Sequence, residues 1–189
     1  MSIPALKYVS SEEYLSLEKD AKEKHEYFDG QIIAMAGATE EHNRIVANLL
    51  RDIGSFLKGK SCDVFPSDFR VATPSSDSYM YPDVSIVCGD IQKKEAGFDT
   101  LLNPSVIIEV MSDSTKSIDR GYKFFSYQQI VSLQEYILID SLRYDVQSIR
   151  RTANNLWAFN KMENTDSFLL IETIQLQLPL SDIYYKVKL

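Results

Sequence analysis

Hydrophobic and polar residues follow two periods along the chain, and these periods predict helices and strands in a definite order. Residues 41–57 show the clearest helical pattern, because their apolar positions recur every three or four residues and form one stripe. A second helix is expected over about residues 119–130. Short apolar runs predict strands at residues 62–65, 69–73, 83–88, 106–111 and 133–140.

The two ends of the chain carry more local signals. Ser10 and Glu13 have the spacing of a capping box, which predicts a short helix over about residues 11–22. An Asp-Gly dipeptide separates two apolar segments within residues 25–35 and favours a tight β-hairpin. Residues 144–178 alternate apolar and polar positions in short pieces, which predicts further antiparallel hairpins.

This order of elements predicts an α/β (α+β) protein with a mixed sheet flanked by helices. The length favours a single domain over residues 1–189. We expect its core at about residues 40–140, preceded by a helix and hairpin at 10–36 and followed by a β-rich tail at 144–189.

The charge balance narrows the classes of partner. Acidic residues number 27 and basic residues 20, so the formal net charge is −7. This surplus disfavours a protein that coats nucleic acid through its overall field, and a polyanion would need a local basic patch. Two groups of cations are candidates, and the second reads more readily as solvated helix faces. They are Lys116, Arg120 and Lys123, and Arg44, Arg51, Lys58 and Lys60.

The sequence disfavours three classes of protein: membrane-spanning proteins, disulfide-stabilised proteins and zinc proteins. No apolar stretch has the length of a membrane span and residues 1–4 begin no leader, so a cytosolic (cytoplasmic) location is expected. Cys62 and Cys88 lie in strand-like runs without metal-ligand spacing and are interpreted as buried free thiols. Two histidines without a His-Glu-x-x-His pattern make zinc an unsuitable cofactor.

Residues 54–61 match the phosphate-binding loop pattern letter for letter, and residues 136–140 resemble its magnesium-binding companion strand. A working loop follows a strand and starts a helix, which aims backbone donors at phosphates. Here a predicted helix precedes Gly54 and a strand follows Ser61, so a helix end capped near Gly59 is the simpler interpretation. A nucleotide hydrolase remains an alternative function.

Glu109 is the most informative single residue, because it interrupts an apolar run that otherwise predicts a buried strand. Removing an ionised carboxylate from water costs several kcal/mol unless a cation or several donors lie beside it. Asp83 follows Pro82 at the start of another apolar run. If the two strands are neighbours, the carboxylates of Asp83 and Glu109 converge, and such a pair favours a divalent cation.

Five segments of the chain carry a resemblance to known proteins. They are residues 42–46, 81–84, 108–115, 119–123 and 135–140. In this order they resemble the PD-(D/E)XK nuclease superfamily, whose restriction endonuclease-like core runs helix, three strands, helix, strand. More narrowly, the chain resembles the Uma family of proposed restriction endonucleases. The superfamily usually places a lysine two residues after its glutamate, whereas Met111 stands there in this chain.

The resemblance implies roles for individual residues. Asp83 and Glu109 would be catalytic metal ligands, and Glu26 a further metal ligand. Lys123 would replace the missing strand lysine, although spacing alone favours a salt bridge from Lys123 to Asp119 one helical turn away. The residues expected near the substrate or in support of the site are His42, Arg120, Lys116 and Glu135, the last as a possible partner of Arg120 or Lys123.

The implied activity is hydrolysis of DNA phosphodiester bonds by a metal-dependent endonuclease. Mg²⁺ is the expected cofactor, with Mn²⁺ able to replace it, and no small-molecule cofactor or membrane partner is expected. Symmetric cutting of duplex DNA would favour a homodimer. A catalytically silent nuclease fold that binds DNA or protein is the alternative from another class.

Overall fold

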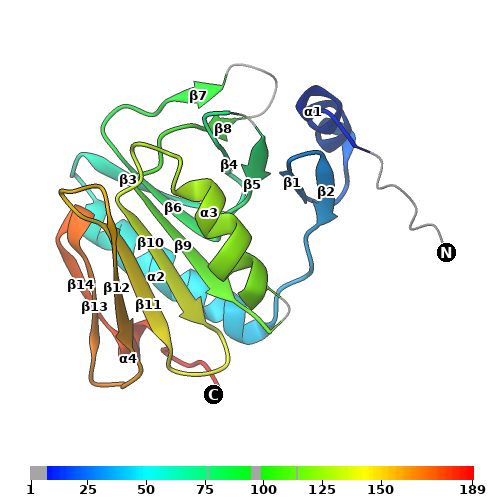
Figure 1. The fold of residues 1–189 in the computed structure, drawn as a ribbon. Helices are drawn as coiled ribbons and strands as arrows, with labels where there is room; N and C mark the ends of the chain where they lie inside the picture. The colour runs from blue at the N-terminus through cyan, green and yellow to red at the C-terminus, as the bar shows by residue number, and fades with distance from the viewer. Residues whose placement is uncertain (1–7, 76, 95–98, 114) are drawn as a thin grey trace.

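The computed structural model describes residues 8–75, 77–94, 99–113 and 115–189, and its centre is a six-stranded mixed sheet with helices on both faces (Figure 1). Residues 1–4, for which no leader was expected, and Ser114 of the resembling segment lie outside the described residues. Within the described part of the chain, no helix has the length and apolar character needed to span a membrane.

The N-terminal signals are confirmed. Helix α1 covers Ser11–Asp20, and the Ser10 hydroxyl accepts the Glu13 N–H at 3.1 Å, as the capping pattern predicts. Strands β1 (His25–Phe28) and β2 (Gln31–Ala34) form the hairpin. Its turn residues, Asp and Gly, both have positive φ, 40° and 88°, which is why this dipeptide suits a two-residue hairpin turn.

Helix α2 covers Glu40–Leu57 and lies behind the central sheet in Figure 1. Its apolar stripe, which includes Ile45, Leu49 and Ile53, is buried against the sheet. The helix ends where Gly59 takes φ of +79° and the Lys60 N–H donates to the Leu57 carbonyl at 2.8 Å. Residues 54–61 therefore form a helix end before a strand, which confirms the simpler interpretation of this motif.

The central sheet has the strand order β12-β11-β10-β9-β6-β3. Strands β9 and β10 are parallel, and the other neighbouring pairs are antiparallel. The strands predicted at residues 62–65, 83–88, 106–111 and 133–140 are thus confirmed in this sheet, including the adjacency of β6 and β9. The bounds are β3 Cys62–Pro66, β6 Val84–Cys88, β9 Val106–Met111, β10 Glu135–Asp140, β11 Val146–Arg151 and β12 Trp157–Met162.

Alternate residues of β9 face different cores. Val106, Ile108 and Val110 pack in the core beneath α2, whereas Ile107 and Met111 pack in the core on the opposite face. Because side chains alternate along a strand, Glu109 points to that opposite face. This face lies under a helical segment that includes a π-helical turn, η1 (Ile118–Lys123), and helix α3 (Phe124–Tyr127), so the helix predicted over 119–130 is shorter than expected.

A second sheet contains the strands of the N-terminal hairpin and short strands that lie in sequence between β3 and β9. Its order is β2-β1-β5-β4-β8-β7. Between Gly89 and Asn103, the described residues form two strands of two residues each, which are too short to give a periodic signal in the sequence. The additional bounds are β4 Arg70–Ala72, β5 Ser78–Met80, β7 Lys93–Lys94 and β8 Thr100–Leu101.

The tail forms the predicted hairpins. Strands β11 and β12 extend the central sheet, and β13 (Phe168–Ile171) pairs with β14 (Leu176–Pro179). A short 3-10 turn, η2 (Glu172–Ile174), connects the latter pair, and helix α4 (Leu180–Ile183) follows it. The Glu135 carboxylate accepts the backbone N–H groups of Glu172 and Thr173, so its expected pairing with Arg120 or Lys123 is wrong.

The interpretation of Cys62 and Cys88 as free thiols is also wrong. The two residues lie directly opposite each other on the antiparallel strands β3 and β6 and form a disulfide. Spacing along the chain carries no information about this register, because the pairing is decided by the tertiary packing of the two strands.

Replacing both Cys62 and Cys88 with Ser should lower the free energy of unfolding by about 3 kcal/mol, because a crosslink between residues 26 positions apart restricts the unfolded chain. Urea denaturation of the oxidised wild type and of the double variant measures the difference. Wild type treated with a reductant serves as the control and should unfold like the variant. Equal midpoints for all three samples would contradict the expectation.

Candidate active site

Asp83 and Glu109 meet because β6 and β9 are antiparallel neighbours, with Val84 opposite Ile108. The start of β6 therefore lies beside the end of β9. The Asp83 N–H donates to Glu109 Oε2 at 3.4 Å, and Asp83 Oδ2 accepts the Val110 N–H at 2.7 Å. The convergence of the two carboxylates expected from the sequence is present in the structure.

The Glu109 carboxylate is buried, with 3% of its side chain exposed. Its Oε1 accepts from the Lys123 ammonium and from the Tyr127 hydroxyl, each at 3.2 Å. Its Oε2 accepts only a longer bond, the one from Asp83, among the contacts of the described residues. The two oxygens thus have different environments, since one lies among side-chain donors and the other faces Asp83.

Lys123 gathers three carboxylates. Its Nζ lies 2.9 Å from Glu26 Oε1, 3.2 Å from Glu109 Oε1 and 3.3 Å from Asp119 Oδ1. The Asp119 contact is the salt bridge that spacing alone predicted, and the Glu109 contact is the one that the resemblance implied. Both are present, because one ammonium lies between the helical turn, the end of β9 and the first hairpin.

Burial and the surplus of carboxylates around Lys123 shift the pKa values of Glu109 and Lys123. Burial raises the pKa of Glu109 well above its usual value, and the charges of Asp119, Asp83 and Glu26 raise it further against the opposing effect of Lys123. Burial alone would lower the pKa of Lys123, but the three carboxylates outweigh it and raise that pKa well above the usual value. The cluster therefore keeps its ammonium charged.

His42, on helix α2, contacts the Asp83 oxygen that does not accept the Val110 N–H. Its Nε2 lies 3.0 Å from Asp83 Oδ1. Burial opposes the charged imidazole, yet the hydrogen bond to Asp83 and its negative charge prevail and raise the pKa of His42. About 16% of the His42 side chain and 15% of the Asp83 side chain are exposed, so solvent reaches the site on this side.

The donor set fits a hard divalent cation beside Asp83. Among the described residues, no three His, Cys, Asp or Glu side chains lie close enough together to hold a metal ion between them. Even so, Asp83 and Glu109 Oε2 supply carboxylate oxygens, which Mg²⁺ and Mn²⁺ prefer, and the surrounding charge is negative. Glu26, the third expected metal ligand, is less suited to bind this ion, because its Oε1 contacts Lys123 and accepts the Tyr81 N–H at 3.2 Å.

The expected substrate-contacting cations lie outside this cluster. Arg120 pairs with Asp145 at 3.6 Å, and Lys116 pairs with Asp113 at 2.6 Å and with Asp140 at 3.1 Å. In the second cation group, Arg44 pairs with Glu40 and Arg51 with Asp52 at exposed positions, as solvated helix faces do.

Sequence reasoning missed Tyr127 as a part of the cluster. Its hydroxyl donates to Glu109, and burial followed by the charge of Glu109 raises the pKa of Tyr127 well above its usual value. One signal was available, since Tyr127 follows Lys123 by four residues and side chains with that spacing share a helix face.

Comparisons with known proteins identify the family of the chain. The family model described as "Uma2: Putative restriction endonuclease" matches residues 11–181. Two proteins of Synechocystis sp. (strain ATCC 27184 / PCC 6803 / Kazusa) are similar over most of their length. "Uncharacterized protein sll1609" is 35% identical over 86% of this chain and 92% of its own, and "Uncharacterized protein slr1290" is 34% identical over 93% and 91%.

A solved structure supports the fold. The crystal structure of "a putative nuclease belonging to DUF820" from Anabaena variabilis ATCC 29413 has a TM-score of 0.78 with this chain. The match covers 93% of this chain and 97% of the other at 20% sequence identity. It confirms the predicted restriction endonuclease-like fold.

Proposed function

The chain belongs to the Uma2 family of restriction endonuclease-like proteins, and on that premise we propose that it is an endonuclease that hydrolyses DNA phosphodiester bonds with a divalent metal ion. The observation that carries this proposal is the contact of Asp83 with Glu109 at adjoining strand ends, with the Lys123 ammonium on the other side of Glu109. Two carboxylates can hold a divalent cation, and a lysine beside them can neutralise charge that develops during hydrolysis.

Asp83 and Glu109 Oε2 are the groups that would hold the metal, with Mg²⁺ preferred and Mn²⁺ able to replace it. When bound, the ion supplies Lewis acidity at a phosphate oxygen and lowers the pKa of an attacking water. Water adds to phosphorus as one P–O ester bond breaks, and the products are a phosphate monoester and a free hydroxyl.

Lys123 is the residue we assign to charge neutralisation. A fixed ammonium in a site with little water stabilises the charge that develops on the phosphate oxygens, and it needs no reorganisation during the reaction. Glu26 and Asp119 hold this ammonium from two further sides and act as positioning residues. His42 holds Asp83 Oδ1 and so restrains the carboxylate that would bind the metal.

Symmetric cleavage of both strands of a DNA duplex requires two such sites, so we propose a homodimer as the acting form.

Replacing Asp83 with Asn should abolish Mg²⁺ binding and lower Mg²⁺-dependent plasmid cleavage at least 100-fold. Asn removes one negative ligand but keeps an oxygen that can accept the Val110 N–H, so the fold is retained. Calorimetric titration of Mg²⁺ into wild type and variant measures the site, and incubation of the same samples with supercoiled plasmid measures the activity.

Asp52→Asn is the matched control, because Asp52 is an ion-paired aspartate on α2 and no part of the cluster. It should bind Mg²⁺ and cleave like wild type. Equal binding and cleavage by wild type and Asp83→Asn would refute the site. Absence of both from wild type would instead favour a silent nuclease fold that binds DNA or protein.

A further inference from the structure

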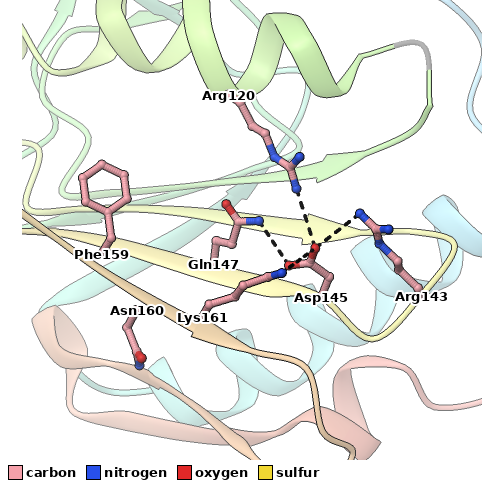
Figure 2. Close-up of a pocket in the computed structure, with 7 residues that line it drawn as sticks. All are labelled: Arg120, Arg143, Asp145, Gln147, Phe159, Asn160 and Lys161. Carbon is pink, nitrogen blue, oxygen red and sulfur yellow. Dashed lines mark hydrogen bonds and ion pairs between the residues drawn. The ribbon is translucent and has the colours of Figure 1, made fainter.

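A second polar site lies on the same face of the central sheet as Glu109. It is a cavity of about 350 Å³ lined mainly by residues of η1, the β10–β11 turn and the strands β11 and β12 (Figure 2). The strand register places it: Glu109 lies opposite Leu138, Leu138 opposite Gln147, and Gln147 opposite Lys161. Three steps between strands of roughly 4.8 Å each separate Glu109 from Lys161 by about 14 Å.

Three cations converge in this cavity on one buried carboxylate, that of Asp145. Its Oδ2 lies 3.6 Å from Arg120, 3.5 Å from Arg143 and 3.6 Å from Lys161, and its Oδ1 accepts from Gln147 at 3.1 Å (Figure 2). Close charge-assisted hydrogen bonds measure about 2.7–2.9 Å. Asp145 therefore gathers the three cations without forming a close pair with any of them.

The cluster also contains the carboxylates of Asp140 and Glu163, so its three cations and three carboxylates balance in number but differ in depth and exposure. Asp140 is buried and accepts from Arg143 at 3.0 Å, so its charge lies beneath the cations. Glu163 pairs with Lys161 at 2.6 Å, but its side chain is 65% exposed at the rim. An exposed ion pair contributes little and is readily exchanged for another anion.

The cations themselves remain accessible. Side-chain exposure is 39% for Arg120, 61% for Arg143 and 47% for Lys161. Phe159 lines the same cavity with 68% of its surface exposed. An exposed aromatic ring beside guanidinium and ammonium groups is the combination with which proteins hold a phosphate and a stacked base.

We propose that this cavity is a subsite for the DNA backbone, in which Arg120, Arg143 and Lys161 bind a phosphate group at a distance from the bond that is cut. This inference rests on the proposed function and extends it to a further binding site. A separation of about 14 Å along the axis of a duplex spans roughly four base pairs at 3.4 Å each. Asp145 acts as a positioning residue that holds the three cations in place.

The test is binding of a fluorescein-labelled DNA duplex in EDTA, measured by fluorescence anisotropy at several salt concentrations. Arg120→Gln and Lys161→Gln should each weaken binding about eightfold at 0.1 M salt and lower the slope of log K against log salt by about 0.9, as loss of one phosphate contact does. Arg51→Gln is the matched control, since Arg51 is an exposed, ion-paired arginine on α2.

Thermal unfolding of each variant verifies that it is folded. Affinities and salt slopes of Arg120→Gln and Lys161→Gln equal to those of Arg51→Gln would overturn the subsite, and so would a wild type that binds no DNA. Plasmid cleavage in Mg²⁺ by the same wild-type protein separates the two proposals, because retained cleavage with no effect of the variants would leave the nuclease function standing.

Discussion

Replacing Lys123 with Met should lower the free energy of unfolding at pH 7 by about 3 kcal/mol, because removal of one partner leaves buried carboxylates without a counter-charge. Lys123 contacts Glu26, Glu109 and Asp119, so the variant would bury three acidic groups around an apolar side chain. Urea denaturation measures the loss. Plasmid cleavage below the unfolding temperature should also fall at least 100-fold if the ammonium stabilises the transition state.

The loss of stability should depend on pH in a defined direction. Without Lys123, the pKa of Glu109 in the folded state lies further above its unfolded value of about 4.3. A carboxyl group with a raised pKa binds more protons in the folded state, so the stability of the variant falls as pH rises above that unfolded value. Because the pKa of Glu109 is already raised in wild type, the deficit relative to wild type should be smallest at pH values below that raised pKa and should grow as the pH rises above it.

Lys93→Met provides the matched control. Lys93 pairs with Asp99 at 2.9 Å, but 45% of its side chain is exposed, and exposed pairs contribute roughly 0–1 kcal/mol. Its stability and cleavage should stay close to those of wild type. If Lys123→Met behaves like Lys93→Met in both measurements, the lysine is neither a structural counter-charge nor a catalytic group.

Replacing Glu109 with Gln should eliminate detectable Mg²⁺-dependent cleavage and weaken Mg²⁺ binding, since the amide removes the negative ligand nearest Asp83. The fold should survive or gain stability, because the change removes one of the carboxylates that compete for Lys123 and a neutral amide is cheaper to bury than a carboxylate. Cleavage assays, calorimetry and thermal unfolding of one preparation check the three expectations.

Glu172→Gln is a suitable control for this change. Glu172 is a half-exposed, ion-paired glutamate that contacts Arg150 and is no part of the cluster. Loss of cleavage in both variants would indicate a general disturbance of the protein, and retained cleavage in Glu109→Gln would exclude Glu109 from the metal site.

Local patterns were sufficient to predict the elements near the site. The Asp-Gly turn, the capping Ser10 and the stripe of α2 act over a few residues, so they are readable in sequence. The meeting of Asp83 with Glu109 followed from one assumption, that two consecutive apolar strands are neighbours. These features depend on short-range physics or on adjacency along the chain.

The features that escaped prediction depend on distant segments. The disulfide requires the register of β3 with β6, and Glu135 finds its donors in residues 172–173 of the tail. Asp145 and Lys161 come together only because β11 and β12 extend the same sheet. For Lys123, the sequence presents the salt bridge to Asp119 and the position beside Glu109 as alternatives. The structure shows both, because a single ammonium can contact Asp119 and Glu109 simultaneously.

The π-helical turn η1 carries side chains of both polar clusters on consecutive positions. Asp119 points to Lys123, and the next residue, Arg120, reaches Asp145. A ligand that restrains Arg120 would also restrain the turn on which Lys123 stands. By thermodynamic linkage, such coupling is reciprocal, so an ion or substrate that orders Lys123 would strengthen binding at Arg120 by the same factor. The two clusters are therefore connected through the single peptide bond between Asp119 and Arg120.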